Sequence, residues 1–354
     1  MTRSILMKAA RIYGAHDIRL IDVPTPEPGM GELLCRVVRA GICGTDHAIY
    51  TGEFSFVKSG MVPFPMTPGH EWSGVVEKIG EGVENFCQGD RVVGDTSVAC
   101  GVCYECLIGR YDHCRKSRAV GTILCWDGAY AEFILMPARH VFPIPETVTF
   151  DNAAMVEPAA TALYAVTLAE VKIGDTVLVL GSGPIGIAAA KLAKLCGASR
   201  VVIVGRKEFK LRKALNLGID DAVNTEDIPF EEGVRNAFGE WGVERVIEAS
   251  GSIELLKKTL KIVKQSAVIS LVAFYEKMIN GFEIDRFVFG DIKLRGVAGS
   301  LGMYRPVLRL MANGMLDLTP LITARYSLAE VPGIMENMPE RNSNRIKEMI
   351  EFPD

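Results

Sequence analysis

The sequence contains no long uncharged apolar run and no excess of basic residues. Its apolar runs are interrupted by glycine or by a charge, so none reaches the ~20 residues that a membrane-spanning helix needs. The N-terminal stretch reaches Lys8 after only a few apolar residues and lacks the apolar core of a secretory signal. A net charge of -4 supplies no basic field for a phosphate backbone. We therefore expect a cytoplasmic protein with neither a membrane nor a nucleic-acid partner.

Internal repeats and low-complexity tracts are also missing, and the composition is that of a compact protein. Of 354 residues, 49% are hydrophobic and 23% charged, as in globular domains. The length exceeds the usual size of one hydrophobic core, which predicts two domains. Four of the nine cysteines fall between residues 100 and 114, a distribution that favours metal thiolates over a disulfide framework.

The hydrophobic pattern changes near residue 155. Before it, short apolar runs such as 33–41 and 71–80 lie among frequent Pro and Gly, which predicts a β-rich, barrel-like domain. After it, strand-like and helix-like segments alternate, which predicts an α/β fold with a doubly wound parallel sheet of the Rossmann type. The expected strands and helices are, in order, 159–171 (helix), 175–181, 184–198 (helix), 201–205, 244–251, 254–264 (helix), 267–274 and 294–299.

The domain boundaries follow from this change of pattern. We place the first domain at residues 1–158 and the Rossmann domain at 159–296. Residues 297–354 contain a helix-like segment at 304–314 and a charged tail. They are too few for a third domain, so we expect them to complete the first.

A glycine-rich turn follows the first strand of the α/β segment. It reads Gly181-Ser182-Gly183-Pro184-Ile185-Gly186 and matches GxGxxG between a strand and a helix. Such glycines provide a tight turn, backbone access to a pyrophosphate at the helix N-terminus, and close helix packing. A turn without a ligand is the alternative, but the strand, helix and second strand around it predict a dinucleotide site.

Gly205, Arg206 and Lys207 stand where an NAD site carries an acidic residue. That acid would bind the ribose 2′-hydroxyl, and Gly205 removes the anion that would repel a 2′-phosphate. If the next helix begins here, Arg206 and Lys210 share one face and form a cationic clamp. The pattern favours NADP over NAD, the alternative being a solvated helix start.

Four cysteines with short spacings offer soft metal ligands within fifteen residues. They are Cys100, Cys103, Cys106 and Cys114, in a segment with little apolar content of its own. A closed tetrahedral Zn²⁺ site would hold such a segment together, and four thiolates leave no open position for a substrate. We predict a structural zinc, with chance or an iron–sulfur cluster as the alternatives.

Three separate fragments carry further candidate ligands. They are Cys43, the pair His70-Glu71, and Glu157 followed by Pro158 at the domain junction. Each has an ordinary structural interpretation by itself, as a core cysteine, a satisfied polar histidine or a salt-bridging glutamate. Taken singly, that interpretation is the favoured one.

Together with the glycine-rich turn and the four cysteines, these fragments resemble the zinc-containing medium-chain dehydrogenases over nearly the whole chain and in the same order. Glu157-Pro158, where alcohol dehydrogenases carry a cysteine, resembles the sorbitol, polyol and sugar-alcohol dehydrogenase branch. The resemblance implies that Cys43 and His70 hold a catalytic zinc, with Glu71 and Glu157 as direct, water-bridged or exchanging ligands. It also implies a GroES-like first domain, a second, structural zinc, and a dimer or tetramer.

The resemblance assigns roles to several other residues. Thr45 matches the family's first proton-relay group, Asp46 a partner of the histidine ligand, and Thr161 a nicotinamide-contacting position. The usual relay histidine is replaced by Ala48, and His47 stands one place earlier. Either His47 passes the proton on in place of the usual relay histidine, or protons leave through water.

The expected reaction is hydride transfer between NADP(H) and a secondary alcohol or ketone, with zinc stabilising the alkoxide or polarising the carbonyl. The branch suggests a polyol, sugar or sugar-acid derivative, although Gly299 and Ser300 replace the Arg-Tyr pair that binds sugar hydroxyls in sorbitol dehydrogenases. Residues 43–50 also suggest a threonine or amino-alcohol dehydrogenase. A catalytically silent NADPH-binding regulator and a zinc module that docks nucleic acid each agree with only a part of the pattern.

Overall fold

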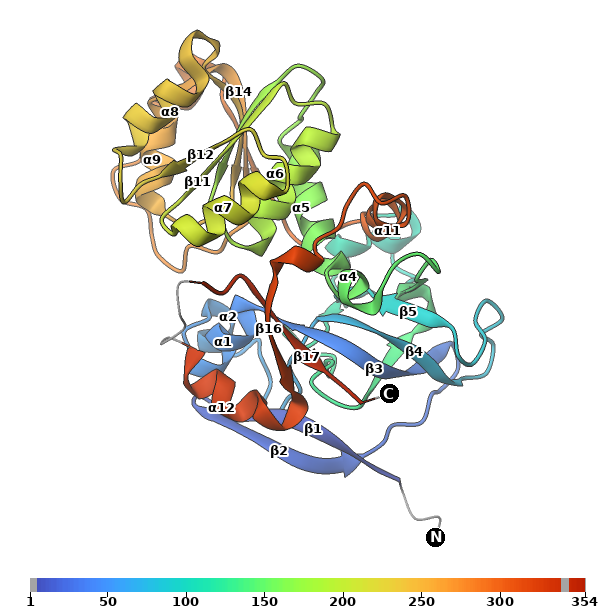
Figure 1. The fold of residues 1–354 in the computed structure, drawn as a ribbon. Coiled ribbons are helices and arrows are strands. Elements are labelled where there is room, and N and C mark those ends of the chain that lie inside the picture. The colour runs from blue at the N-terminus through green and yellow to red at the C-terminus, as the bar shows by residue number, and fades with distance from the viewer. Residues whose placement is uncertain (1–4, 339–343, 354) are drawn as a thin grey trace. The chain divides into compact units, whose positions relative to one another are not determined.

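The computed structural model describes residues 5–338 and 344–353 (Figure 1), and these divide into two compact units. The first unit comprises Met1–Glu157, Tyr304–Asn342 and Lys347–Asp354, and the second comprises Pro158–Met303 and Ser343–Ile346. Residues 297–303, which the sequence pattern places in the first domain, belong to the second unit here. They continue from its last strand, and the Val297 N–H donates to the Leu271 carbonyl at 2.9 Å. In the described part of the chain, no helix has the length and apolarity to cross a membrane.

The second unit is built on a six-stranded parallel sheet in the order β12-β11-β10-β13-β14-β15. This order reverses beside the first strand, as in dinucleotide-binding Rossmann folds, and confirms the predicted fold class. The strands are β10 (Thr176–Leu180), β11 (Arg200–Gly205), β12 (Asp221–Asn224), β13 (Val243–Glu248), β14 (Val263–Leu271) and β15 (Lys293–Gly296).

Helices cover both faces of this sheet (Figure 1). The helices are α5 (Val156–Leu168), α6 (Pro184–Leu195), α7 (Glu208–Asn216), α8 (Phe230–Phe238), α9 (Ile253–Leu260) and α10 (Asp285–Gly290). Leu178 and Leu180 of β10 share one core with apolar residues of α8 and α9. Val179 points to the opposite face, toward α6. Every residue of β10 is buried, as expected for a strand covered on both sides.

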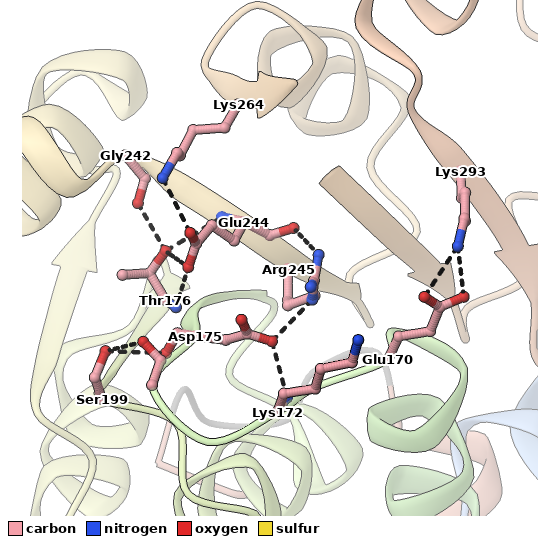
Figure 2. Close-up of polar contacts among 11 residues, drawn as sticks. Glu170, Lys172, Asp175, Thr176, Ser199, Gly242, Glu244, Arg245, Lys264 and Lys293 are labelled. Atoms are coloured by element: carbon pink, nitrogen blue, oxygen red, sulfur yellow. Dashed lines mark hydrogen bonds and ion pairs between the residues drawn. The ribbon is translucent and has the colours of Figure 1, made fainter. Parts of the chain in front are cut away.

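Polar contacts join the loops at the amino ends of β10 and β13 (Figure 2). The Glu244 carboxylate accepts hydrogen bonds from the Thr176 backbone N–H at 2.9 Å and from Lys264 Nζ at 3.0 Å. Arg245 pairs with Asp175 at 2.9 Å, and both side chains are largely buried. These contacts provide hydrogen-bond partners for backbone groups at the amino-terminal ends of the strands, opposite the ends that carry the glycine-rich turn.

The Glu244→Gln variant is expected to lose less free energy of unfolding than the wild type as the pH falls. Burial opposes ionisation, but hydrogen bonds from Thr176 and the charge of Lys264 outweigh it and lower the pKa of Glu244 from 4.5. A depressed pKa contributes stability that is present above the unfolded value and is lost as pH falls through the folded value. Denaturant unfolding between about pH 6 and pH 3 measures this slope. Glu254→Gln is the control, because Glu254 is exposed and its lysine partner lies 3.9 Å away; equal slopes in the two variants would contradict the expectation.

The first unit contains a seven-stranded sheet with the order β16-β17-β3-β4-β5-β9, and β8 also pairs with β3. Its strands are β3 (Glu32–Ile42), β4 (Glu71–Ile79), β5 (Arg91–Gly94), β8 (Phe133–Pro137), β9 (Val141–Pro143), β16 (Ile322–Ser327) and β17 (Lys347–Glu351). Two smaller antiparallel pairs are β1 (Leu6–Gly14) with β2 (Asp17–Pro24) and β6 (Ser97–Val98) with β7 (Arg118–Ala119). The helices are α1 (Gly44–Thr51), α2 (Ser55–Lys58), α3 (Tyr104–Leu107), α4 (Phe150–Ala154), α11 (Tyr304–Ala312) and α12 (Val331–Glu336).

The register of this sheet brings three distant segments to one point. β3 pairs antiparallel with both β4 and β17, so the end of β3 lies beside the starts of the other two strands. Gly41 is opposite Glu71 on β4 and opposite Met349 on β17. Cys43 directly follows β3 and His70 directly precedes β4, so both lie near Lys347, the first residue of β17.

Candidate metal and nucleotide sites

The residues at this strand junction form a cluster of metal-binding type. Ligand atoms of Cys43, His70 and Glu71 all lie within 4.8 Å of one another. His70 and Glu71 are buried, while Cys43 is partly exposed. A thiolate, an imidazole and a carboxylate are ligands that Zn²⁺ accepts, and three protein ligands are typical of a catalytic site that keeps one position open.

Lys347 is a member of this cluster that the sequence did not reveal. Its Nζ lies 2.6 Å from both carboxylate oxygens of Glu71 and donates to the Ile42 carbonyl at 3.2 Å. Both side chains are almost completely buried. Burial opposes its charge, but Glu71 and Cys43 outweigh this and raise the pKa of Lys347. A Cβ on Gly41 would collide with the Glu71 carboxylate, so Gly41 is needed for this pairing.

The Asp46 carboxylate lies beside the His70 ring. Its Oδ1 lies 3.4 Å from His70 Nδ1, which leaves Nε2 as the ring nitrogen for a metal. Its Oδ2 accepts hydrogen bonds from the Cys43 backbone N–H at 2.9 Å and from the Tyr130 hydroxyl at 2.8 Å. Despite complete burial, which opposes ionisation, the charge of His70 and these two donors lower the pKa of Asp46. The carboxylate therefore stays ionised.

Glu157 lies near this cluster without joining its closest group. It is the second residue of α5, is partly buried, and is not among the three residues whose ligand atoms lie within 4.8 Å. Burial raises the pKa of Glu157 to about 7, with His70 opposing the rise and Glu71 adding to it.

The candidate relay residues lie on α1, directly after Cys43. Thr45 is partly exposed in the first turn of this helix. The His47 ring packs against Tyr50 with centroids 6.1 Å apart, and Tyr50 in turn contacts His16 at 5.3 Å. Thr161 lies one helical turn after Glu157 on α5.

The four cysteines converge as predicted from their spacing. Their Sγ atoms approach one another at 3.5 Å (Cys103–Cys106), 3.8 Å (Cys103–Cys114) and 3.9 Å (Cys100–Cys106). Zn–S bonds of about 2.3 Å in a tetrahedron give sulfur separations of about 3.8 Å, so the group fits a closed zinc site. Backbone N–H groups of Val102 and Cys103 lower the pKa of Cys100 to about 6, which favours the thiolate that a metal needs.

Buried polar residues tie this four-cysteine segment to the sheet. The Tyr111 hydroxyl donates to Asp95 at 2.9 Å, and the Ala99 backbone N–H donates to His140 Nε2 at 3.1 Å. Burial lowers the pKa of His140 to about 4, so its ring is a neutral acceptor. The segment is thereby anchored next to Cys100.

The glycine-rich turn has the geometry of a phosphate-binding turn. Gly181 has φ of 106°, and a Cβ there would lie 2.9 Å from the Ala249 backbone. A Cβ on Gly186 would strike the Gly181 carbonyl, because α6 packs closely on the strand. Gly183 instead faces open space, where a diphosphate could reach the N-terminus of α6. Pro184 and Ile185 form the first turn of α6.

The predicted cationic clamp has a different arrangement in the structure. Helix α7 begins at Glu208, so Arg206 precedes the helix and does not share a helical face with Lys210. A pocket of about 740 Å³ opens here, and its lining includes Arg206, Lys207, Arg212 and Lys213 but not Lys210. Lys207 is paired with Glu226 at 2.7 Å and Arg212 with Glu208 at 3.2 Å.

Gly205 excludes any side chain from the end of β11. A Cβ at this position would collide with the Ser182 hydroxyl and lie 2.9 Å from Leu211. The acid that binds a ribose 2′-hydroxyl therefore has no room here, and Arg206 is the first side chain after the strand.

Comparison with known proteins identifies the family of this chain. Residues 29–146 match the alcohol dehydrogenase GroES-like domain, and residues 184–313 match the zinc-binding dehydrogenase family. The L-threonine 3-dehydrogenase of Chromobacterium violaceum is 31% identical over 92% of this chain and 94% of its own length. The sorbitol dehydrogenase of Bacillus subtilis is 27% identical, with 97% of each chain covered. A crystal structure from Sinorhizobium meliloti 1021, described as a zinc-binding dehydrogenase bound to NADP, has 31% identity and a TM-score of 0.91, covering 98% of this chain and 100% of its own.

The chain belongs to the zinc-dependent medium-chain alcohol dehydrogenase family. The family assignment from the separated fragments and the predicted pairing of a GroES-like with a Rossmann domain are confirmed. It is an oxidoreductase that acts on CH–OH groups.

Proposed function

We propose that this enzyme holds one catalytic zinc at Cys43, His70 and Glu71 and one structural zinc at Cys100, Cys103, Cys106 and Cys114. The observation that carries the catalytic site is the convergence of three ligand types within 4.8 Å, beside a carboxylate that orients the histidine. We propose Glu157 as the exchanging ligand, because its carboxyl group is buried within electrostatic range of both His70 and Glu71. Elemental analysis tests the proposal: two zincs per chain support it, and a single zinc held by the cysteines would overturn the catalytic site.

The protein's own groups then orient the substrate and carry protons. Bound zinc and nicotinamide would supply, respectively, a Lewis acid for the substrate oxygen and the hydride acceptor or donor. Asp46 holds the His70 ring, and Lys347 holds the Glu71 carboxylate. In this proposal the Thr45 hydroxyl accepts the substrate's hydroxyl proton as it gives up its own, and that proton reaches solvent through water or through His47.

We also propose that the cofactor is NADP(H), with Arg206 as the main contact to the 2′-phosphate. The support is the exclusion of an acid at Gly205 and the position of Arg206 in a pocket with three other cationic side chains. Lys210, which lies outside this pocket, is a weaker contributor. The NADP-bound relative from S. meliloti is consistent with this choice.

Arg206→Ser is expected to weaken NADPH binding by about tenfold or more, since one charge-assisted contact contributes about 1.5 kcal/mol. NADH, which has no 2′-phosphate, should bind with unchanged affinity. Fluorescence titration of both cofactors measures the difference. The exposed Arg235 on α8 provides a control, because Arg235→Ser should alter neither affinity. Equal weakening of NADPH and NADH by Arg206→Ser would contradict 2′-phosphate recognition.

The substrate that we propose is a secondary alcohol or its ketone, of the polyol, sugar or sugar-acid class. The sorbitol dehydrogenase relative and the Glu157-Pro158 pair support the class. Gly299, with a positive φ of 79°, and the buried Ser300 replace the usual sugar-binding side chains in this segment. A panel of polyols, sugar phosphates and sugar acids, followed by formation of the reduced cofactor, identifies the substrate.

An amino-alcohol dehydrogenase is the second candidate, because the C. violaceum relative is a threonine dehydrogenase. L-threonine belongs in the same panel for this reason. Turnover of L-threonine at a higher kcat/KM than any polyol would favour this candidate and exclude the first.

We propose that the enzyme forms a homodimer through β15. This strand lies at the edge of the six-stranded sheet, and all four of its residues are exposed. Large apolar side chains are exposed in the neighbouring segments, namely Phe274, Met278, Ile284, Val288 and Phe289. An unpaired edge strand with apolar flanks favours pairing with a second copy. Light scattering of the purified protein tests this, and a monomer would contradict it.

A further inference from the structure

Tyr130 contacts Asp46 and the segment that precedes His70 in the proposed catalytic metal site. No sequence pattern indicated a role for this residue. It lies between the four-cysteine segment and β8, and its side chain is completely buried. Its hydroxyl donates to Asp46 Oδ2 at 2.8 Å and lies 3.4 Å from the Gly41 carbonyl. Burial, reinforced by the charge of Asp46, raises the pKa of Tyr130 well above its usual value, so the hydroxyl remains a donor.

The backbone around Tyr130 forms hydrogen bonds with the segment that carries His70. The Tyr130 N–H donates to the Pro68 carbonyl at 3.0 Å, and the Ala129 N–H donates to the Gly69 carbonyl at 2.8 Å. Gly69 has φ of 97°, and a Cβ there would collide with the Tyr130 ring. The residue before His70 is therefore fixed by backbone hydrogen bonds and by close packing on the tyrosine ring.

The two carboxylate oxygens of Asp46 contact different groups. Oδ2 is held by the Tyr130 hydroxyl and by the Cys43 backbone N–H, and Oδ1 faces His70 Nδ1. Without the hydroxyl, one donor would remain to fix the carboxylate plane. The carboxylate could then rotate about its terminal bond and weaken its contact with the imidazole.

We propose that Tyr130 is a positioning residue for the catalytic metal: its hydroxyl locks the Asp46 carboxylate, which sets the tautomer and orientation of His70. This inference rests on the proposed zinc site. The hydroxyl acts through Asp46 on the metal ligand and touches neither substrate nor cofactor. Partners of ligand histidines commonly contribute about ten- to a hundredfold to metal affinity.

Tyr130→Phe tests the proposal, because it removes one oxygen and keeps the ring packed on Gly69. Competition with a chromophoric chelator should show about a tenfold higher Kd for the catalytic zinc and an unchanged Kd for the structural zinc. Tyr275→Phe is the matched control, since the Tyr275 hydroxyl donates at 2.7 Å to Glu248 in the second unit. The control should leave both zinc affinities unchanged.

A double-mutant cycle separates positioning from a general loss of stability. In an Asp46→Asn background, Tyr130→Phe should not raise the zinc Kd further, because its effect passes through Asp46. Additive effects, or a Tyr130→Phe protein that binds the catalytic zinc as tightly as the wild type, would overturn the inference. If the wild type binds zinc only at the four cysteines, the proposed catalytic site fails instead, and the two failures are distinct.

Discussion

In the zinc-free protein, Lys347→Met should lower the free energy of unfolding of the first unit by about 3–5 kcal/mol, because it leaves the Glu71 carboxylate buried without its cation. Lys347 Nζ contacts both Glu71 oxygens at 2.6 Å, and both side chains are at most 3% exposed. Methionine has similar volume and leaves little cavity, so the loss reports charge. Denaturant unfolding followed by tryptophan fluorescence, to which Trp72 and Trp126 of the first unit contribute, measures it.

Two further variants show whether the cost comes from the buried charge. Glu71→Gln in the Lys347→Met background should recover most of the lost stability, because the uncompensated anion is then gone. Lys78→Met removes a lysine of the same unit that contacts both oxygens of Glu27, at 2.8 and 3.1 Å, but that pair is 43% and 71% exposed. An exposed pair contributes about 0–1 kcal/mol. A Lys347→Met protein that loses no more stability than Lys78→Met would contradict the expected cost.

Cys43→Ser should abolish most of the catalytic activity, with kcat/KM falling by about a thousandfold or more. Removing a Lewis acid costs several kcal/mol of transition-state stabilisation, and each 1.36 kcal/mol is about a factor of ten. The zinc content should fall from two per chain to one, since the four cysteines of the other site are untouched. NADPH binding should persist, because the glycine-rich turn and Arg206 belong to the second unit.

Cys87→Ser is the matched control for this prediction. Cys87 is exposed in the same unit and lies outside both groups of metal-ligand residues. Its replacement should change neither the zinc content nor the activity. A Cys43→Ser protein that keeps both zincs and its activity would show that the catalytic metal, if present, is held elsewhere.

Local sequence patterns are sufficient to predict the second unit's architecture. The apolar run at 175–181 forms β10, and GxGxxG forms its turn into α6. Short or polar elements escape such patterns: β12 has only four residues, with Asp221 and Asn224 at its ends. The predicted helix at 254–264 ends earlier, at Leu260, because Val263 begins β14 and a short apolar run does not distinguish the two periods.

The start of α7 shows why the cationic clamp was misplaced. Its N-cap residue is Lys207, whose side chain makes no capping hydrogen bond. Helix starts are recognised in a sequence by Ser, Thr, Asp or Asn at this position, and none occurs here. The local sequence therefore does not determine whether Arg206 lies inside the helix, and with it whether Lys210 shares its face.

Long-range partners of the catalytic cluster could not be read from the sequence. Lys347 reaches Glu71 only because β17 pairs with β3, and Tyr130 reaches Asp46 across 84 positions of the chain. Neither residue belongs to a motif: Lys347 is the first residue of β17, and Tyr130 lies in a bend before β8. The ligands were recognised because Cys43, His70 and Glu157 each occur in a short characteristic fragment.

The pairing of β17 with β3 also determines when the catalytic pocket can form during synthesis. The second unit is almost continuous in the chain, and a ribosome that has passed residue 303 has made nearly all of it. The first unit is made in two parts with the second unit between them, and the cation that neutralises Glu71 belongs to the later part. The nucleotide-binding unit can therefore fold on the ribosome, whereas the catalytic cluster is complete only after Lys347 has been translated and has left the ribosome.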